Sequence, residues 1–371
     1  MRIRRIFAAL AIVVTAAACV GDSTGQSGGV AAAAPDRPYH HAPGGGFRNP
    51  EGSATWKPET FDFVRFLVAR FADEGEHAIV PQHYLVQREE ARARLAATAE
   101  PRITWIGHST FLIGLAGRNI LTDPFFSERA SPVYFAGPKR FVPPGLDIDE
   151  LPPIDLIVIS HNHYDHMDLA ALKKLGARFP NVRVLVPLGD GPLVKETGIA
   201  DVRELDWYDE DGIAGVKVTS VPAIHRANRG LFDLNKTLWC GYVISGAGQK
   251  IWFAGDTGSG PVFANEVAKK VGPVDTALIP IGGFLPRDVL RAVHASPEES
   301  LELARLMGAK TAIGMHWGTL PLGADTPIDA IKQFEAADTP GLAKVLMKIG
   351  ETRPLVSNQL SALPEVPAPP P

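Results

Sequence analysis

The chain has 371 residues, of which 45% are hydrophobic and 21% are charged, as in an ordinary soluble globular protein. Its formal net charge of -4 argues against nucleic acid as a partner, because proteins that bind nucleic acid usually carry a basic stripe or a high pI. The length allows one large domain or two small ones.

Residues 1–18 predict a signal peptide, because a basic start is followed by the apolar run "IFAALAIVVTAAA", which is too short to span a bilayer comfortably. Cys19 follows the small residues "AAA", an arrangement that resembles a bacterial lipobox and predicts lipidation of Cys19. Ordinary cleavage after Ala18 is the alternative, and Arg4-Arg5 resembles a twin-arginine export signal. We therefore expect an exported cell-envelope lipoprotein that faces the periplasm or the cell surface.

Both ends of the mature chain have compositions typical of linkers. Residues 19–46 are rich in Gly, Ser, Ala and Pro and predict a flexible tether, and residues 356–371 predict a Pro-rich tail. Residues 47–355 are then expected to form one folded domain, which carries any active site. The remaining cysteine, Cys240, has no partner for an intramolecular disulfide and is expected as a buried thiol in a strand. The apolar segment 61–71 predicts either a helix packed on the core or a surface that meets membrane or acyl chains.

Apolar runs separated by turns predict an α/β fold of several strands with interspersed helices. The first three runs form an antiparallel meander, and the run "IDLIVIS" has the continuous apolar pattern of a strand buried on both faces. A helix is expected to begin at Ser296. Ser296 as the N-cap, Pro297 at the first helical position and Glu299 at the third are typical of helix starts. In chain order the expected strands are 102–106, 111–115, 119–123, 154–160, 183–187, 216–222, 240–244, 250–256, 275–281 and 310–316, with helices at 169–179 and 296–308.

The sequence "SHNHYDHMD", residues 160–168, places three histidines and two aspartates directly after the apolar run 154–160. Crevices outside the carboxyl ends of strands are where open α/β sheets hold their sites. A tight loop can direct His161 and His163 to one point, and Asp165 and His166 to another about 3.5 Å away, as in a binuclear metal site. Imidazole and carboxylate ligands suit Zn²⁺, Fe or Mn²⁺.

Three more polar residues, His225, Asp256 and His316, each come directly after an apolar, strand-like run. A single histidine in such a place is usually structural. Three cases together with the histidine-rich motif favour a common metal centre.

This order of residues resembles the metallo-β-lactamase superfamily. The resemblance implies an αββα sandwich with two metal ions, zinc above all, in a groove at one edge. It implies that His161, His163 and His225 hold the first metal, and that Asp165, His166 and His316 hold the second. Asp256 would bridge both, where one large group of true β-lactamases has cysteine.

Over roughly residues 47–350 the chain also resembles the N-acyl-phosphatidylethanolamine-hydrolysing phospholipase D group. The segments that carry this resemblance are "WIGHST", "RASP", "GPKRF", "SHNHYDHMD", "FAGDTG", "VHASPEE" and "HWGT". Residues 133–136 depart from the animal enzyme, which puts the lipid preference in doubt. The resemblance also implies a homodimer.

The function implied is a binuclear zinc phosphodiesterase of phospholipase D type that acts on N-acyl-phosphatidylethanolamine or related glycerophospholipids. Hydroxide held between the two ions would attack phosphorus. Asp165, Asp256 and His294 are the catalytic candidates, and His294 could bind the phosphate or protonate the leaving oxygen. Hydrolysis of a β-lactam, lactone or other ester is one alternative, and a non-catalytic envelope lipoprotein that binds metal and lipid is another.

Residues around the expected groove supply candidates for substrate binding. Lys139 and Arg140 could meet a phosphate group or be simply solvated, and the aromatic side chains near them could belong to the core or line an acyl groove. His108 either orients a ligand or satisfies a buried turn, and for Asp123 a turn role is favoured over an orienting role. The substrate-binding candidates are Tyr134, Phe135, Lys139, Arg140 and His294.

Overall fold

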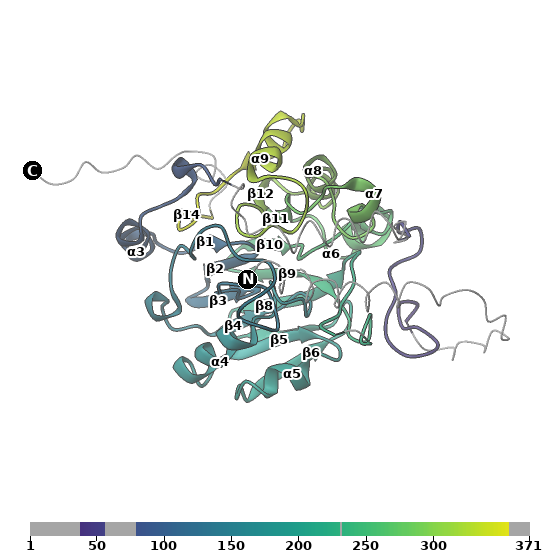
Figure 1. Cartoon of the computed structure of the whole chain (residues 1–371), viewed down its shortest axis with the longest axis horizontal. Helices are drawn as coiled ribbons and strands as arrows, with labels where there is room; N and C mark the ends of the chain where they lie inside the picture. Colours follow the sequence, from purple (N-terminus) through teal and green to yellow (C-terminus); the bar gives the residue numbers. More distant parts are fainter. Residues whose placement is uncertain (1–37, 56–78, 231, 356–371) are drawn as a thin grey trace, which may run out of the picture.

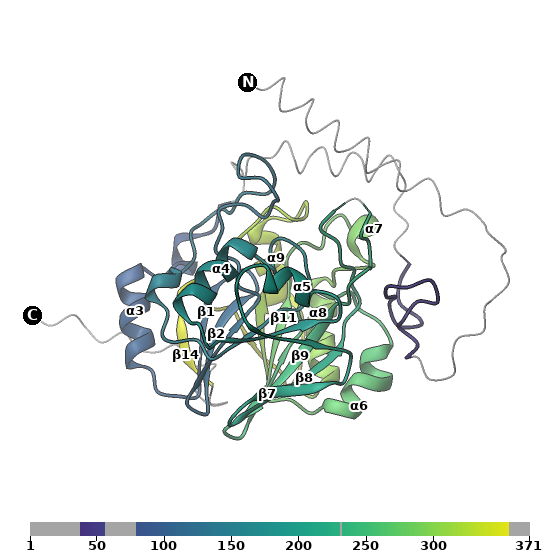
Figure 2. The same cartoon turned by 90° about the horizontal axis from the view of Figure 1, so that it is seen from below.

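Two seven-stranded sheets lie against each other in the computed structural model, which describes residues 38–55, 79–230 and 232–355 (Figures 1 and 2). The first sheet has the order β14-β1-β2-β3-β4-β5-β6, and the second has the order β13-β12-β11-β10-β9-β8-β7. The strands of the first sheet are β1 (Arg102–Gly107), β2 (Thr110–Leu115), β3 (Arg118–Thr122), β4 (Leu156–Val158), β5 (Arg183–Pro187), β6 (Asp201–Leu205) and β14 (Thr352–Pro354). Those of the second are β7 (Glu210–Ile213), β8 (Val216–Pro222), β9 (Cys240–Gly246), β10 (Gln249–Phe253), β11 (Thr276–Pro280), β12 (Thr311–Met315) and β13 (Ala343–Val345).

Each sheet joins an antiparallel half to a parallel half. Strands β1, β2 and β3 form the predicted antiparallel meander, and β3 to β6 then pair in parallel. In the second sheet β7 to β10 are antiparallel, and β10 to β13 are parallel. The parallel halves bring the carboxyl ends of several strands to one edge, where loops can converge on a site.

The burial of β2 and β4 shows why the first sheet lies between two layers. Successive side chains of a strand point to opposite faces. Phe111 and Ile113 of β2 belong to the large core between the sheets, and Leu112 between them belongs to the smaller core beneath α4. In β4, Leu156 faces the inner core and Ile157 the outer one. The continuous apolar run of the sequence is therefore a strand buried on both faces.

Helices cover the outer faces of both sheets. Figure 1 shows α4 and α5 over the first sheet and α8 and α9 over the second, which gives the predicted αββα sandwich. The helices are α3 (Arg88–Ala97), α4 (Leu169–Arg178), α5 (Gly191–Lys195), α6 (Ala268–Val271), α7 (Arg287–Leu290), α8 (Pro297–Leu306) and α9 (Pro327–Ala336), with a π-helix η3 (Phe263–Val267) and 3₁₀ turns η1 (Gln82–Tyr84) and η2 (Ile148–Glu150).

The start of α8 follows its sequence signature. The Ser296 hydroxyl accepts the amide of Glu299, and the Glu299 carboxylate accepts the amide of Ser296, so both form a capping box. Cys240 is a buried free thiol at the start of β9, as expected. Among the described residues, no helix combines the length and apolar composition needed to cross a membrane.

Three predictions concern parts of the chain that lie outside the described residues: the signal peptide with Cys19, the segment 61–71 and the Pro-rich tail. The last part of the expected tether does lie within them. Residues 38–46 contact the folded domain, for example through the hydrogen bonds of His40 and His41 with the Asp206 carboxylate. The described domain therefore includes residues that the sequence assigned to the linker.

Candidate metal centre

Loops at the carboxyl ends of four strands carry the predicted metal ligands. The histidine-rich loop follows β4, and His225, Asp256 and His316 follow β8, β10 and β12, respectively. All of these ligands are buried except His163, which is partly exposed. Both sheets thus contribute to one site at a shared edge.

The first group of ligands consists of His161, His163 and His225. One nitrogen of each lies within 4.8 Å of the others. His161 Nε2 is 2.8 Å from His163 Nδ1, and His225 Nε2 is 3.3 Å from the same nitrogen. The structure therefore brings together the three histidines that the sequence assigned to the first metal.

The second group gathers around the Asp165 carboxylate. Asp165 Oδ2 lies 3.4 Å from His166 Nε2 and 3.7 Å from His316 Nε2. His108 joins the group, with its Nε2 donating to Asp165 Oδ2 at 3.0 Å. Of its two possible roles, His108 thus takes the one that orients a ligand.

Asp256 lies between the two groups. Its Oδ2 is 3.2 Å from His166 Nε2, 3.0 Å from His316 Nε2 and 3.9 Å from His225 Nε2. Its Oδ1 is buried without a hydrogen bond among the described residues. A carboxylate with one unbonded oxygen between two clusters of nitrogens fits a ligand shared by two cations.

Four histidines direct one ring nitrogen toward the site and the other toward an oxygen outside it. Such outer partners fix the tautomer and the ring orientation of a metal-binding imidazole. The pairs are His161 Nδ1 with Ser160 Oγ at 2.9 Å, His166 Nδ1 with Asp123 Oδ2 at 2.6 Å, His225 Nδ1 with the Val293 carbonyl at 2.8 Å and His316 Nδ1 with the Gly282 carbonyl at 3.2 Å.

Asp123 holds residues of the site in place through hydrogen bonds, although the sequence favoured a local turn role for it. Its Oδ1 accepts the Ser160 amide at 2.7 Å, and its Oδ2 accepts both the Ser160 hydroxyl and His166 Nδ1–H at 2.6 Å. The Ser160 hydroxyl in turn accepts from His161. One buried carboxylate therefore orients a histidine of each group.

The electrostatics of the second group favour positive charge. Burial lowers the pKa values of His161, His163 and His225, the last to about 4. For His166 and His316 the nearby carboxylates outweigh burial; the pKa of His316 rises to about 9 and that of His166 lies well above its usual value. Without a metal, protonated His166 and His316 balance the negative charge of these carboxylates. A divalent cation would supply that positive charge instead.

The donor set fits such cations. Imidazole nitrogens and carboxylate oxygens, without thiolate, suit Zn²⁺, Fe and Mn²⁺. Cys240 does not compete, because it lies at the start of β9 and appears in none of the ligand clusters of the described residues.

His294 lies beside both groups, as the sequence suggested. Its ring is 5.1 Å from that of His225 and 5.4 Å from that of His316, measured between centroids. Its Nδ1 is 3.9 Å from Asp256 Oδ2 and has no hydrogen-bond partner among the described residues. This buried nitrogen therefore has unused hydrogen-bonding capacity next to Asp256.

The other substrate candidates divide into two kinds. Tyr134 and Phe135 are exposed, at 89% and 59%, in the loop before β4. The Lys139 ammonium pairs with Glu128 at 2.8 Å, as a solvated basic residue does. Arg140 stacks on the buried ring of Phe125 at 4.9 Å, and its Nε and Nη1 have no hydrogen-bond partner in the described structure. Nothing places these four side chains on the metal groups.

His40 and His41 both bind one carboxylate, a contact that was not predicted from the sequence. His40 Nε2 lies 2.5 Å from Asp206 Oδ1, and His41 Nε2 lies 2.7 Å from Asp206 Oδ2. The adjacent histidines were a visible signal, but Asp206 is 165 residues away from His41. The pairing depends on the fold.

Comparison with known proteins decides the family. The model of the "Beta-lactamase superfamily domain" matches residues 118–317. The chain belongs to the metallo-β-lactamase superfamily. It is 38% identical over 263 residues to N-acyl-phosphatidylethanolamine-hydrolyzing phospholipase D 1 of Caenorhabditis elegans, covering 67% of this chain and 74% of that protein.

Two further comparisons extend this result. The mitochondrial N-acyl-phosphatidylethanolamine-hydrolyzing phospholipase D of Saccharomyces cerevisiae is 32% identical over 238 residues, which cover 62% of this chain but only 50% of the yeast protein. The solved structure of Igni18, a metallo hydrolase from Ignicoccus hospitalis, matches with a TM-score of 0.51 and 22% identity over 68% of this chain and 96% of that one. The last match concerns the fold alone. Together the comparisons make this superfamily member a metal-dependent hydrolase.

Proposed function

We propose that the protein is a phosphodiesterase of phospholipase D type, with two zinc ions, that hydrolyses N-acyl-phosphatidylethanolamine or a related glycerophospholipid. The observation that carries the proposal is the Asp256 carboxylate, which lies between two histidine-containing groups with His294 beside it. The similarity to two relatives named for this reaction supports the choice of substrate.

Two divalent ions in these groups would neutralise a phosphodiester anion and lower the pKa of water toward neutrality, so that hydroxide is available as the nucleophile. The protein's own contribution is to hold the groups in place. His161, His163 and His225 would hold one ion, and Asp165, His166 and His316 the other.

Asp256 contributes as a permanently ionised carboxylate. Burial by itself raises its pKa, but the neighbouring His166 and His316 outweigh burial and hold the pKa well below its usual value. Asp256 is therefore an acceptor and a ligand rather than a proton donor.

His294 would bind an oxygen of the phosphate or of the leaving alkoxide. Its Nδ1 lies 3.9 Å from Asp256 Oδ2 and lacks a protein partner in the described chain. A hydrogen bond to the departing oxygen stabilises the charge that develops there.

The experiment is product analysis with the purified, metal-quantified protein. N-acyl-phosphatidylethanolamine should yield phosphatidic acid and the N-acylethanolamine, and zinc, iron and manganese are measured in the same sample. A simple phosphodiester, a β-lactam and a lactone are tested in parallel. Turnover of the lactam or lactone alone, with two metals bound, would replace the proposal by its main alternative.

The location and assembly of the protein are part of the same proposal. A lipidated Cys19 would hold the enzyme at a membrane surface, where its phospholipid substrate is found, outside the cytoplasm. Replacing Cys19 by Ser should abolish incorporation of labelled fatty acid and release the protein from membranes. Sedimentation of the purified chain tests the expected homodimer.

A further inference from the structure

An asparagine from the N-terminal segment, residues 38–55, holds the backbone of a histidine in the first group. Asn49 Nδ2 donates to the His225 carbonyl at 2.8 Å, and Asn49 Oδ1 accepts the His225 amide at 2.9 Å. We propose that Asn49 is a positioning residue, which sets the place of His225 and thereby the metal affinity of the first group.

His225 requires such support because of where it lies. It follows β8 in a loop and is not part of any strand of the described chain, so no ladder bonds its peptide groups. Buried peptide groups need partners. The amide of Asn49 meets the donor and the acceptor of the same residue, as a paired strand would, from 176 positions away in the sequence.

The orientation of the Asn49 amide is fixed by a third partner. Trp239 Nε1 donates to Asn49 Oδ1 at 3.0 Å, and also to the Ala223 carbonyl at 3.0 Å. An indole nitrogen can only donate, so the oxygen of Asn49 must face Trp239 and the His225 amide. The amide nitrogen must then face the His225 carbonyl, which leaves one arrangement of the group.

The segment that carries Asn49 is itself anchored. His40 and His41 bind Asp206, and the Phe47 amide donates to the Asn235 carbonyl at 2.8 Å. Asn235 belongs to the same loop, between β8 and β9, as His225. The segment is therefore fastened to the loop that it supports.

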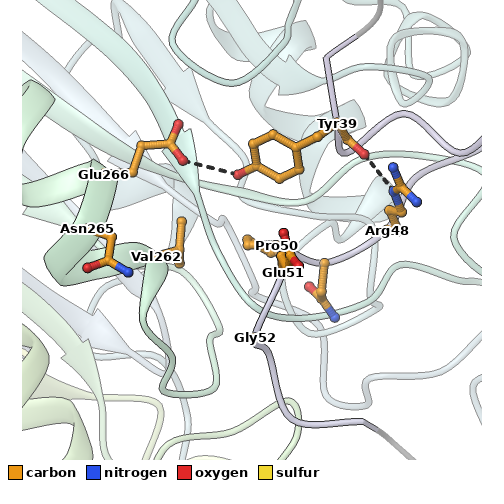
Figure 3. A pocket seen from close by; sticks show the side chains of 9 residues that line it. Tyr39, Arg48, Pro50, Glu51, Gly52, Val262, Asn265 and Glu266 are labelled. Carbon is orange, nitrogen blue, oxygen red and sulfur yellow. Dashed lines mark hydrogen bonds between the residues drawn. The ribbon is translucent and has the colours of Figure 1, made fainter. Parts of the chain in front are cut away.

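On its other side the segment borders a cavity of about 850 Å³ (Figure 3). Figure 3 shows Tyr39 and Arg48 of the segment across from Val262 and Glu266. The Tyr39 hydroxyl donates a hydrogen bond of 3.4 Å to the Glu266 carboxylate. Asn49 also lines this cavity. The hydrogen bonds of Asn49 therefore hold it against His225 on the side away from this cavity.

Other hydrogen bonds hold the His225 ring and the residue before it. The Val293 carbonyl lies 2.8 Å from His225 Nδ1, and the Thr257 hydroxyl accepts the Ile224 amide at 2.9 Å. The backbone of His225 itself is left to Asn49. Metal–ligand distances tolerate only about 0.2 Å, and loss of a partner behind a ligand typically lowers metal affinity about 10- to 100-fold.

The test measures metal affinity, so it depends on the proposed metal centre but not on the substrate. Zn²⁺ binding to the full chain is followed by competition with a chromophoric chelator. The variants are Asn49→Leu, which keeps the size but removes all three bonds, and Asn49→Asp, which keeps the acceptor and loses the donor. His163→Ala identifies the binding step of the first group. Asn119→Leu is the control. Asn119 donates to the Pro153 carbonyl at the start of β3, the end of that strand away from the metal centre.

We expect Asn49→Leu to weaken Zn²⁺ binding at the first group about 10- to 100-fold, and to change binding at the second group less than threefold. Asn49→Asp should give an intermediate loss, and the control should bind both ions as the wild type does. Wild-type affinity at the first step in a folded Asn49→Leu protein would overturn the proposal. If circular dichroism shows that Asn49→Leu does not fold, wild-type affinity in Asn49→Asp would overturn it equally.

Failure of the proposed reaction would have a different signature. A wild-type chain that binds two ions but hydrolyses no phosphodiester would refute the phospholipase assignment and leave the role of Asn49 standing. Equal losses at both binding steps in Asn49→Leu would mean that Asn49 supports the fold generally, which would also overturn its specific role.

Discussion

Replacement of Asp123 by Asn tests how the histidines are oriented. All three partners of the Asp123 carboxylate are donors: the Ser160 amide, the Ser160 hydroxyl and His166 Nδ1–H. The amide of Asn has one oxygen and one NH₂ group, so in either orientation the NH₂ meets at least one donor. The change is nearly isosteric, but it removes the charge of the carboxylate and replaces one acceptor oxygen by a donor.

The structure sets the size of the effect. If the NH₂ group faces His166, the ring must take the tautomer whose Nδ1 accepts, and the proton then sits on Nε2, the nitrogen that faces Asp165 and Asp256. A protonated Nε2 cannot bind a cation. We expect metal affinity at the second group to fall about 10- to 100-fold, equivalent to about 1.4–2.7 kcal/mol. The first group should weaken less, because His161 is reached only through Ser160.

The assay is chelator competition on the wild type and Asp123→Asn, with Asp155→Asn as the control. The Asp155 carboxylate accepts the Asn119 amide and pairs with Arg118. It lies where β4 begins, at the end of the strand opposite the metal centre. Unchanged affinity at the second group, in a variant with wild-type circular dichroism, would refute the idea that Asp123 selects the tautomer.

Three further outcomes are expected. His294→Ala should lower kcat on a phosphodiester about 10²- to 10⁴-fold and leave the bound metal, measured by mass spectrometry, unchanged. Burial raises the pKa of Asp190 to about 8. Between about pH 4 and 8 Asp190 is therefore protonated in the native state but ionised in the unfolded chain, so the free energy of unfolding falls as pH rises over that range. The melting temperature of Asp190→Asn relative to wild type should therefore increase over that range. Gly282→Ala should lower the melting temperature, at a cost of about 1–3 kcal/mol, because the new Cβ would overlap the His316 carbonyl oxygen.

The sequence predicted which side chains gather at one edge of the sheets, because each is marked locally. His161, His225, Asp256 and His316 all follow a strongly apolar strand, and strand ends that share an edge bring their loops together. Ten of the strands were predicted from their apolar runs. By contrast β6, β7, β13 and β14 were missed; the central residues of β6, for example, are exposed and form no apolar run.

The supporting residues could not be predicted in the same way. Asp123 was assigned mainly to a turn, since its partners Ser160 and His166 lie 37 and 43 residues away. Asn49 lies 176 residues from His225. These bonds form only once the strands are ordered in the sheets, so neither spacing nor composition indicates them.

The central claim is that two cations share the Asp256 carboxylate. Anomalous diffraction from crystals loaded with Zn²⁺, collected on both sides of the zinc absorption edge, tests it most directly. We expect two peaks about 3.5–4 Å apart, one next to His161, His163 and His225 and the other next to Asp165, His166 and His316. A single peak, or two peaks that do not both contact Asp256, would contradict it.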